Sequence, residues 1–325
     1  MEQSVNDTTP KPAPDDSLLS LAFAIQSNPG AYALILGAGV SAGSGLPTAW
    51  EVLEDLALRV ANLVEQAEPN DPVAWYESRF DEPARYGNIL ERLGSTPAER
   101  QGILRRYFEP EREGPDSESP APTIAHESIA RLASEGVIRV IVTLNFDRLV
   151  ETALRNVGLE PTVVSTEADA AGLGPLHSVR CCVIHLHGDY LNADSMLNTT
   201  TELASYGPSI QKLLSRVVED YGLIISGWSS DYDPALRATI SERYPRRFSM
   251  AWMDPNQQSE LGADLLNSKN GVFVQSSAEE GFSWLVDAVT SLREREARHP
   301  LTVSVAVETA KRELAGRWVA INLHD

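Results

Sequence analysis

Glycine and hydroxyl residues are concentrated at 37–47, GAGVSAGSGLP, directly after the apolar run AYALIL at 31–36. A buried strand, a glycine-rich turn and a helix start can bind phosphate, because glycine lets the backbone approach an anion and free amides donate to it. The third glycine stands one position late for a dinucleotide fingerprint, and no lysine follows as in a P-loop. The spacing predicts a phosphate cradle of another kind; the alternative is a plain tight turn.

Polar residues also follow the apolar run VIRVIV at 137–142, where Thr143, Asn145 and Asp147 alternate with apolar ones. Polar groups at the carboxyl end of a parallel strand face the crevice where ligands bind. We therefore consider Asn145 and Asp147 candidate site residues. The alternative is that one of them caps a helix expected at 146–157.

Two histidines, His185 and His187, close the apolar run 182–186. Histidine is well suited to accept a proton near neutral pH. Because residues two apart share a strand face, the pair could instead bind a metal together with Asp189. A structural histidine is the third interpretation.

Glycine and serine recur after the run 221–226, where the sequence is SGWSSD at 226–231. Gly227 and Ser229 could form a second anion-binding turn. An ordinary turn is the alternative.

The elements that must position these residues are short, continuously apolar runs separated by helical patterns. Continuous apolar character is typical of strands buried on both faces. The alternation predicts a doubly wound, mainly parallel, Rossmann-like α/β sheet. Strands are expected at 31–36, 137–142, 182–186, 221–226, 247–252 and 271–274, and helices at 17–26, 123–135, 146–157, 201–219, 232–243 and 279–293.

The domain boundaries follow from composition. Residues 1–16 are polar and proline-rich, which predicts a disordered lead-in. The α/β domain is expected at 17–293, with an inserted helical module at about 60–122 that follows a helix beginning near a Thr48–Glu51 capping box. Residues 294–325 look like a further helix and strand, either a small terminal unit or the start of a further domain.

Charge and cysteine content exclude several classes of protein. The 325 residues contain 27 Lys and Arg against 46 Asp and Glu, a net charge of −19, which disfavours binding to nucleic acid or anionic membranes. Only two cysteines, Cys181 and Cys182, occur, so a four-thiolate zinc site cannot form. No signal peptide and no apolar stretch of about 18 residues is evident. A reducing cytoplasm is the expected location.

Taken in order, the four motifs resemble those of the sirtuin superfamily. Its GAG-x-S-x-x-SG-[IL]-P pattern is similar to 37–47, its T-x-N-x-D to 143–147, its L-H-G to 186–188 and its G-x-S to 227–229. Protein-deacetylating sirtuins also carry two C-x-x-C zinc pairs after the histidine, and this chain has no cysteine there. The chain looks more like the zinc-free sirtuin-like NAD+ hydrolase domains of bacterial anti-phage (abortive infection) defence systems. That group carries a G-[YW]-S-x-x-D turn, to which 227–231 is similar, with Asp231 one position early or Asp233 one position late.

The resemblance implies NAD+ as substrate, no metal, and cleavage to ADP-ribose and nicotinamide. It implies catalytic roles for His187, Asn145 and Asp147. The residues that it implies for NAD+ binding are Gly37, Ala38, Gly39, Ser41, Gly45, Thr48, Thr143, Gly227, Ser229 and Asp231.

Free NAD+ hydrolysis is toxic, so the activity is expected to be gated. The resemblance implies a homo-oligomer and an activating defence partner, such as an ATPase, an Argonaute-like protein or a phage-sensing subunit. No direct contact with nucleic acid or membrane is expected.

Three other functions remain open on the sequence. One is a sirtuin-type NAD-dependent protein deacylase or ADP-ribosyltransferase, which the missing zinc ligands disfavour. Another is a metal-dependent hydrolase using His185, His187 and Asp189. The last is a non-catalytic subunit that binds NAD+ or ADP-ribose without turnover.

Overall fold

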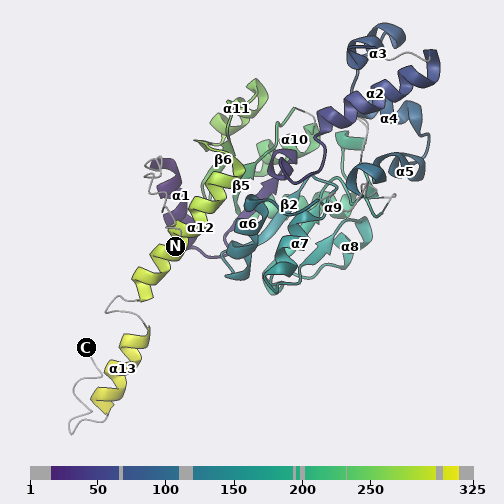
Figure 1. Ribbon diagram of the computed structural model, residues 1–325. Coiled ribbons are helices and arrows are strands. Elements are labelled where there is room, and N and C mark those ends of the chain that lie inside the picture. Colours follow the sequence, from purple (N-terminus) through teal and green to yellow (C-terminus); the bar gives the residue numbers. More distant parts are fainter. Residues whose placement is uncertain are drawn as a thin grey trace, which may run out of the picture.

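A seven-stranded sheet forms the centre of the computed structural model (Figure 1), which describes residues 16–65, 69–109, 120–192, 195–197, 202–231, 233–297 and 303–314. Every neighbouring pair of strands is parallel, and the spatial order is β3-β4-β2-β1-β5-β6-β7. The predicted doubly wound, parallel α/β fold is therefore confirmed. The strands are β1 (Tyr32–Leu36), β2 (Ile138–Thr143), β3 (Thr162–Val164), β4 (Cys182–His185), β5 (Gly222–Ser226), β6 (Met250–Asp254) and β7 (Val272–Gln275).

The central strand β1 is buried on both faces, as its apolar run predicts. Leu34 and Leu36 pack into one core cluster, whereas Ala33 and Ile35 pack into the other. The two clusters follow from the period of two in a strand, which turns successive side chains to opposite faces.

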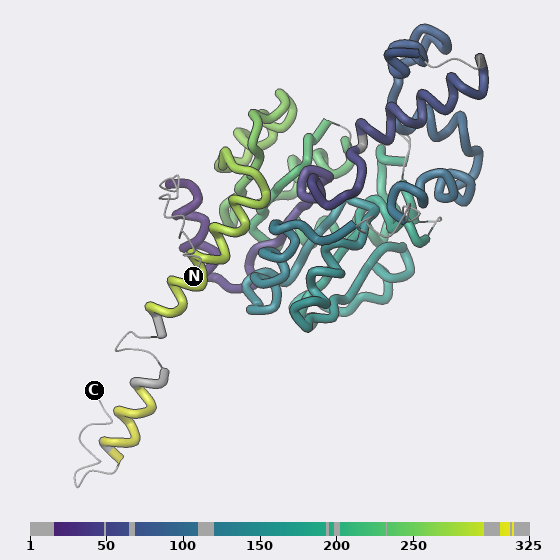
Figure 2. The backbone as a smooth tube through the Cα atoms, in the orientation of Figure 1, coloured from purple at the N-terminus to yellow at the C-terminus, as the bar shows by residue number. Residues whose placement is uncertain are grey.

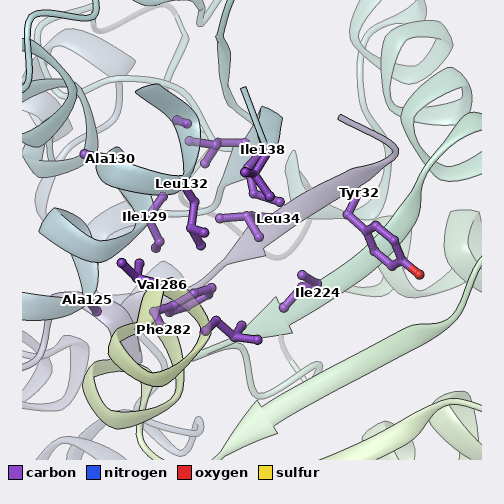
Figure 3. Close-up of a cluster of buried hydrophobic side chains, with 14 of the residues drawn as sticks. Tyr32, Leu34, Ala125, Ile129, Ala130, Leu132, Ile138, Ile224, Phe282 and Val286 are labelled. Atoms are coloured by element: carbon purple, nitrogen blue, oxygen red, sulfur yellow. The ribbon is translucent and has the colours of Figure 1, made fainter. Parts of the chain in front are cut away.

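Helices cover both faces of the sheet (Figure 2). One layer consists of α1 (Asp16–Ser27), α6 (Ile124–Ser134), α7 (Leu149–Asn156) and α12 (Ala278–Ala297). The other layer consists of α8 (Glu167–Gly172), α9 (Pro208–Asp220), α10 (Pro234–Arg243) and α11 (Glu260–Ser268). In the first layer Ile129 of α6 and Phe282 of α12 meet Leu34 of β1 (Figure 3).

Four further helices lie between β1 and α6 and enclose a core of their own. They are α2 (Ala49–Glu65), α3 (Pro72–Phe80), α4 (Tyr86–Leu93) and α5 (Pro97–Phe108). Leu56, Tyr76 and Leu90 are fully buried in this core. The boundary expected near residue 60 falls inside α2, whose first turn carries the Thr48–Glu51 capping box: the Thr48 amide donates to Glu51 Oε2 over 2.6 Å.

The chain ends in a helix, α13 (Val303–Leu314). The lead-in expected at 1–16 lies outside the described residues except for Asp16, which begins α1, and so does the strand expected after α13. Among the residues that are described, none of the helices has the length and apolar character needed to cross a membrane.

Candidate functional site

The loops that follow β1, β2, β4 and β5 meet at one edge of the sheet, because all four strands are parallel and adjacent. β1 pairs with β2 on one side and with β5 on the other. From β2 the chain builds the half of the sheet that contains β4 and β3, and from β5 it builds the opposite half through β6 and β7. A doubly wound sheet forms its ligand crevice at such a reversal of strand order. The four motifs picked out in the sequence are the four loops at this edge.

The glycine loop after β1 packs backbone to backbone on the turn after β5. The amide of Gly37 donates to the Ser226 carbonyl over 2.9 Å, and the amide of Gly39 donates to the Gly227 carbonyl over 3.1 Å. A Cβ on Gly37 would lie 2.3 Å from the Gly227 oxygen, so no larger residue fits. Because these two amides donate within the protein, phosphate donors must come from the other amides and hydroxyls of the two loops.

Asn145 is fixed by the glycine loop. Its side-chain nitrogen donates to the Gly37 carbonyl over 3.2 Å and to Ser41 Oγ over 3.1 Å. Its own amide donates to Thr143 Oγ1 over 3.1 Å. Both side-chain amide hydrogens are thereby used, which leaves the Asn145 side-chain oxygen to accept a hydrogen bond from a ligand.

Asp147 is buried behind Asn145. Ser41 Oγ donates to its Oδ2 over 2.9 Å, and the Leu149 amide donates to its Oδ1 over 3.0 Å at the start of α7. Burial raises the pKa of Asp147 against the lowering effect of these two hydrogen bonds. The N-cap of α7 is Arg148, so Asp147 is not itself the helix cap that the alternative interpretation expected. It accepts from the first helical amide through Oδ1, and its second oxygen positions Ser41 for Asn145.

His187 is held by Asp233, which the resemblance offered only as the alternative to Asp231 and without a role beside the histidine. Its Nε2 lies 2.6 Å from Oδ2 of Asp233, and the imidazole is 13% exposed while the Asp233 side chain is 2% exposed. The Tyr206 hydroxyl donates to the same carboxylate oxygen, and the Leu236 amide donates to the other over 2.8 Å. Burial, followed by the charge of Asp233, raises the pKa of Tyr206, which keeps the hydroxyl protonated as a donor.

The sequence around Asp233 gives a weak signal that this residue caps a helix. Asp233 precedes Pro234 at the start of α10, an arrangement typical of a helix N-cap. Its neighbour Asp231, named in the sequence analysis, is exposed instead. No local pattern marks Tyr206.

His185 does not join His187 in a metal site. Its Nδ1 lies 3.1 Å from the Asn145 carbonyl, and its Nε2 lies 2.8 Å from Oε1 of Glu151, with both side chains fully buried. Asp189 pairs instead with Arg148 at 3.0 Å. Across the described ranges no three His, Cys, Asp or Glu side chains group together to hold a metal ion. In this geometry the three side chains have separate partners, which does not favour the metal-hydrolase interpretation for this trio.

The His185–Glu151 pair is a buried acid–base contact. Burial alone would lower the pKa of His185, but the hydrogen bond and charge of Glu151 outweigh it and raise that pKa. Burial likewise opposes ionisation of Glu151, but the hydrogen bond and charge of His185 lower its pKa. Both shifts favour the ionised form of the pair, and His185 also contacts the Asn145 carbonyl.

Aromatic rings connect the helical module to the site. Phe146, between Asn145 and Asp147, lies 6.5 Å from the His187 ring and 6.1 Å from Phe108 at the end of α5. Phe108 stacks on Tyr190 at 5.2 Å. The module therefore touches the loops after both β2 and β4.

The remaining residues expected at the site lie at the edges of the loops and make no described contact with His187. Ala38, Gly45, Thr48 and Ser229 lie in this group, all of them exposed. Gly45 has a φ of +86°, which favours glycine. The Ser229 carbonyl accepts from Ser259 Oγ over 3.2 Å, which ties the β5 turn to α11.

The parallel sheet, with the loops at the carboxyl ends of its strands meeting at one edge, defines a Rossmann-like α/β protein. Within it, residues 139–270 match a family model described as SIR2-like domain. The match covers the loops of Asn145, His187 and Gly227 but not the glycine loop at 37–47. It supports the resemblance to the sirtuin superfamily.

Solved structures of Sir2 proteins are similar to the chain at low identity. A Sir2 homologue in complex with NAD shares 19% identity, with 84% of this chain and 94% of that chain covered and a TM-score of 0.46. A structure described as the basis for the mechanism and regulation of Sir2 enzymes shares 17%, with 86% and 99% covered and a TM-score of 0.47. A mutant Sir2 homologue in complex with ADP-ribose shares 19%, with 85% and 97% covered and a TM-score of 0.45. A search of curated proteins returned no match.

Proposed function

We propose that the protein is an NAD+ glycohydrolase that cleaves NAD+ to ADP-ribose and nicotinamide. The observation that carries the proposal is the His187–Asp233 pair, an oriented and partly exposed imidazole at the same edge of the sheet as the packed loops after β1 and β5. The match to a SIR2-like domain supports it, as do the NAD and ADP-ribose complexes of similar proteins.

The loops after β1 and β5 lie together at the edge of the sheet where a dinucleotide would bind. Gly37, Gly39 and Gly227 let the two loops pack backbone to backbone, since a Cβ on any of them would collide with the opposite loop. The remaining amides and the hydroxyls of the two loops would hold the phosphates. The chain needs no lysine for this, because amide dipoles and hydroxyls can neutralise a pyrophosphate locally. The net charge of −19 is therefore compatible with the proposal.

His187 acts as the base in the proposed reaction. Because Nε2 of His187 faces Asp233, the neutral ring carries its hydrogen on that nitrogen and leaves Nδ1 to accept a proton. The bond between nicotinamide and C1 of the ribose breaks, its electron pair leaves with nicotinamide, and a water oxygen bonds to C1. The proton of that water, or of a ribose hydroxyl, goes to Nδ1, and Asp233 stabilises the imidazolium.

Asn145 orients the ribose or the attacking water through its free side-chain oxygen. The two donor contacts to Gly37 and Ser41 hold that oxygen in place, and Asp147 holds Ser41 in turn. Such positioning lowers the entropy cost of reaching the transition state.

The test is incubation with NAD+, with nicotinamide and ADP-ribose species separated by chromatography. We expect turnover by the wild type and its loss in His187→Ala. His177→Ala is the matched control, since His177 is exposed on the short helix before β4, whereas His187 follows the other end of that strand. Turnover by His187→Ala equal to wild type contradicts the proposal. Nicotinamide release only with an acylated peptide indicates a protein deacylase. NAD+ that stays intact on prolonged incubation with activated protein indicates a binding subunit.

The biological role we propose is gated NAD+ depletion in bacterial anti-phage defence, in the cytoplasm and as a homo-oligomer. The activating partner would be an ATPase, an Argonaute-like protein or a phage-sensing subunit. The contact of Phe108 with Phe146 supports gating, because a shift of the helical module would move the residue beside His187. Equal specific activity in dilute and in concentrated, assembled protein contradicts gating by self-association.

A further inference from the structure

A cavity of about 570 Å³ lies at the edge of the sheet opposite the candidate site. Tyr32 and Met250, the first residues of β1 and β6, form part of its wall. The five residues of β1 separate it from the glycine loop, a span of roughly 15 Å at the usual rise per residue. A molecule bound here would not occupy the catalytic crevice.

The cavity is cationic in an acidic protein. Of its eight lining residues, Arg246, Arg247 and Lys269 are basic and none is acidic. The Arg246 guanidinium donates to the Ser268 carbonyl, and the Lys269 ammonium donates to the Ser241 carbonyl over 2.5 Å. A carbonyl fixes a cation without cancelling its charge. Within the described part of the chain, no carboxylate forms an ion pair with any of the three cations.

The loops that hold these cations have an uncommon backbone. Four non-glycine residues in the described ranges have positive φ, and two of them, Arg246 at +56° and Asn270 at +52°, line this cavity. Asparagine tolerates this region, but an arginine there is disfavoured. Such conformations persist where the surrounding structure enforces them, and they are enriched at binding sites.

The wall also supplies an aromatic ring and hydroxyl groups. Phe248 is half-buried and lies 5.7 Å from the Tyr32 ring, and the Tyr32 hydroxyl pairs with Ser249 Oγ at 3.0 Å. Three cations and an aromatic ring in the lining of one cavity suit an anionic group attached to a small organic body.

We propose that this cavity binds a phosphate-bearing small molecule, with the phosphates held by Arg246, Arg247 and Lys269 and the organic part against Phe248. The site is separate from the crevice between β1 and β5. The proposal does not depend on the reaction catalysed there.

The test is calorimetric titration with pyrophosphate and with ADP. The variant combines Arg246→Gln, Arg247→Gln and Lys269→Gln. The control combines Arg131→Gln, Lys212→Gln and Arg295→Gln, three exposed cations outside the cavity, so that both proteins change net charge equally. We expect pyrophosphate affinity to fall at least tenfold in the cavity variant and less than twofold in the control.

ADP distinguishes a bare anion site from one that also accepts an organic group. We expect ADP to bind more tightly than pyrophosphate to the wild type, and Phe248→Ala to remove that advantage. The opposite ranking overturns the role of Phe248. Equal pyrophosphate affinity in the two triple variants, no wild-type binding below about 10 mM, or equal competition by chloride at matched ionic strength overturns the site.

Folding and catalysis are checked separately. If the triple variant does not fold by circular dichroism, Arg247→Gln alone serves, since Arg247 is exposed and forms no described hydrogen bond; we expect about three- to tenfold weaker binding. NAD+ turnover should be unchanged in the cavity variant at saturating NAD+. Failure of the proposed hydrolase would appear in that assay, whereas failure of this site would appear as equal titrations of the two triple variants.

Discussion

The imidazole of His187 and the carboxylate of Asp233 lie 2.6 Å apart, although 46 residues separate them in the chain. The same carboxylate caps α10 through the Leu236 amide and accepts the Tyr206 hydroxyl. One buried side chain therefore combines a structural role, the start of a helix, with the orientation of the proposed base. The two roles can be separated by experiment.

Asp233→Asn should reduce NAD+ turnover by about 10²–10⁴-fold while leaving the fold intact. Asparagine can still accept from the Leu236 amide, but it no longer stabilises an imidazolium. Asp71→Asn is the matched control, because Asp71 also precedes a proline and caps a helix, accepting from the Ala74 amide over 2.9 Å. Initial rates and urea unfolding of both variants check this, and a wild-type rate for Asp233→Asn would exclude its role with His187.

Asn145→Ala should lose at least about a hundredfold in NAD+ turnover, because the positioned oxygen disappears. The free energy of unfolding should fall by only about 1–3 kcal/mol, for the two donor contacts to Gly37 and Ser41. Asn28→Ala, which removes an exposed contact to the Ala24 carbonyl, is the control for side-chain loss. Retained turnover with lost stability would make Asn145 structural only.

Glu151→Gln should destabilise the protein by about 3–5 kcal/mol near pH 6, because it leaves His185 buried without its anion. The raised pKa of His185 contributes stability below its unfolded value, about 6.5, and that contribution is lost as pH rises through the folded pKa. The lowered pKa of Glu151 contributes stability above its unfolded value, about 4.3, and that contribution is lost as pH falls through the folded pKa. The difference from wild type should therefore be largest between about pH 4.3 and 6.5.

Unfolding titrations at several pH values measure that difference. The control is Glu160→Gln, which breaks an exposed pair with Arg155 and should change stability little at any of them. A difference for Glu151→Gln that does not vary with pH would contradict an ionised pair.

Gly37→Ala should lower stability by about 1–3 kcal/mol and abolish turnover, because its Cβ would lie 2.3 Å from the Gly227 oxygen and push the two loops apart. Gly102→Ala, in α5 with open space around its Cβ position, should instead stabilise by about 0.5–1 kcal/mol. Thermal melting and NAD+ turnover of both variants check this. Equal stability of the two variants would mean that the contact between the loops after β1 and β5 tolerates a side chain.

The bounds of the strands and helices show where local sequence patterns suffice to predict an element. The fully buried strands β1 and β5 were predicted within a residue, because burial on both faces requires a continuous apolar run. The short strand β3 was missed, since its three residues are at an edge and only Val164 is buried. The helices α8 and α11 were also missed, and α9 begins at Pro208 rather than near residue 201.

The sequence alone picked out the four loops that meet at one edge of the sheet, because glycine, asparagine and histidine at strand ends are recognisable from their immediate neighbours. It did not determine the partners of those residues. Asn145 contacts Gly37, which lies 108 positions away in the sequence. Asp233 contacts Tyr206 and His187, which lie 27 and 46 positions away. The parallel sheet decided these contacts, since it brings the carboxyl ends of separate strands to one edge. Burial then decided the roles: it paired His185 with Glu151 and left His187 partly exposed with Asp233.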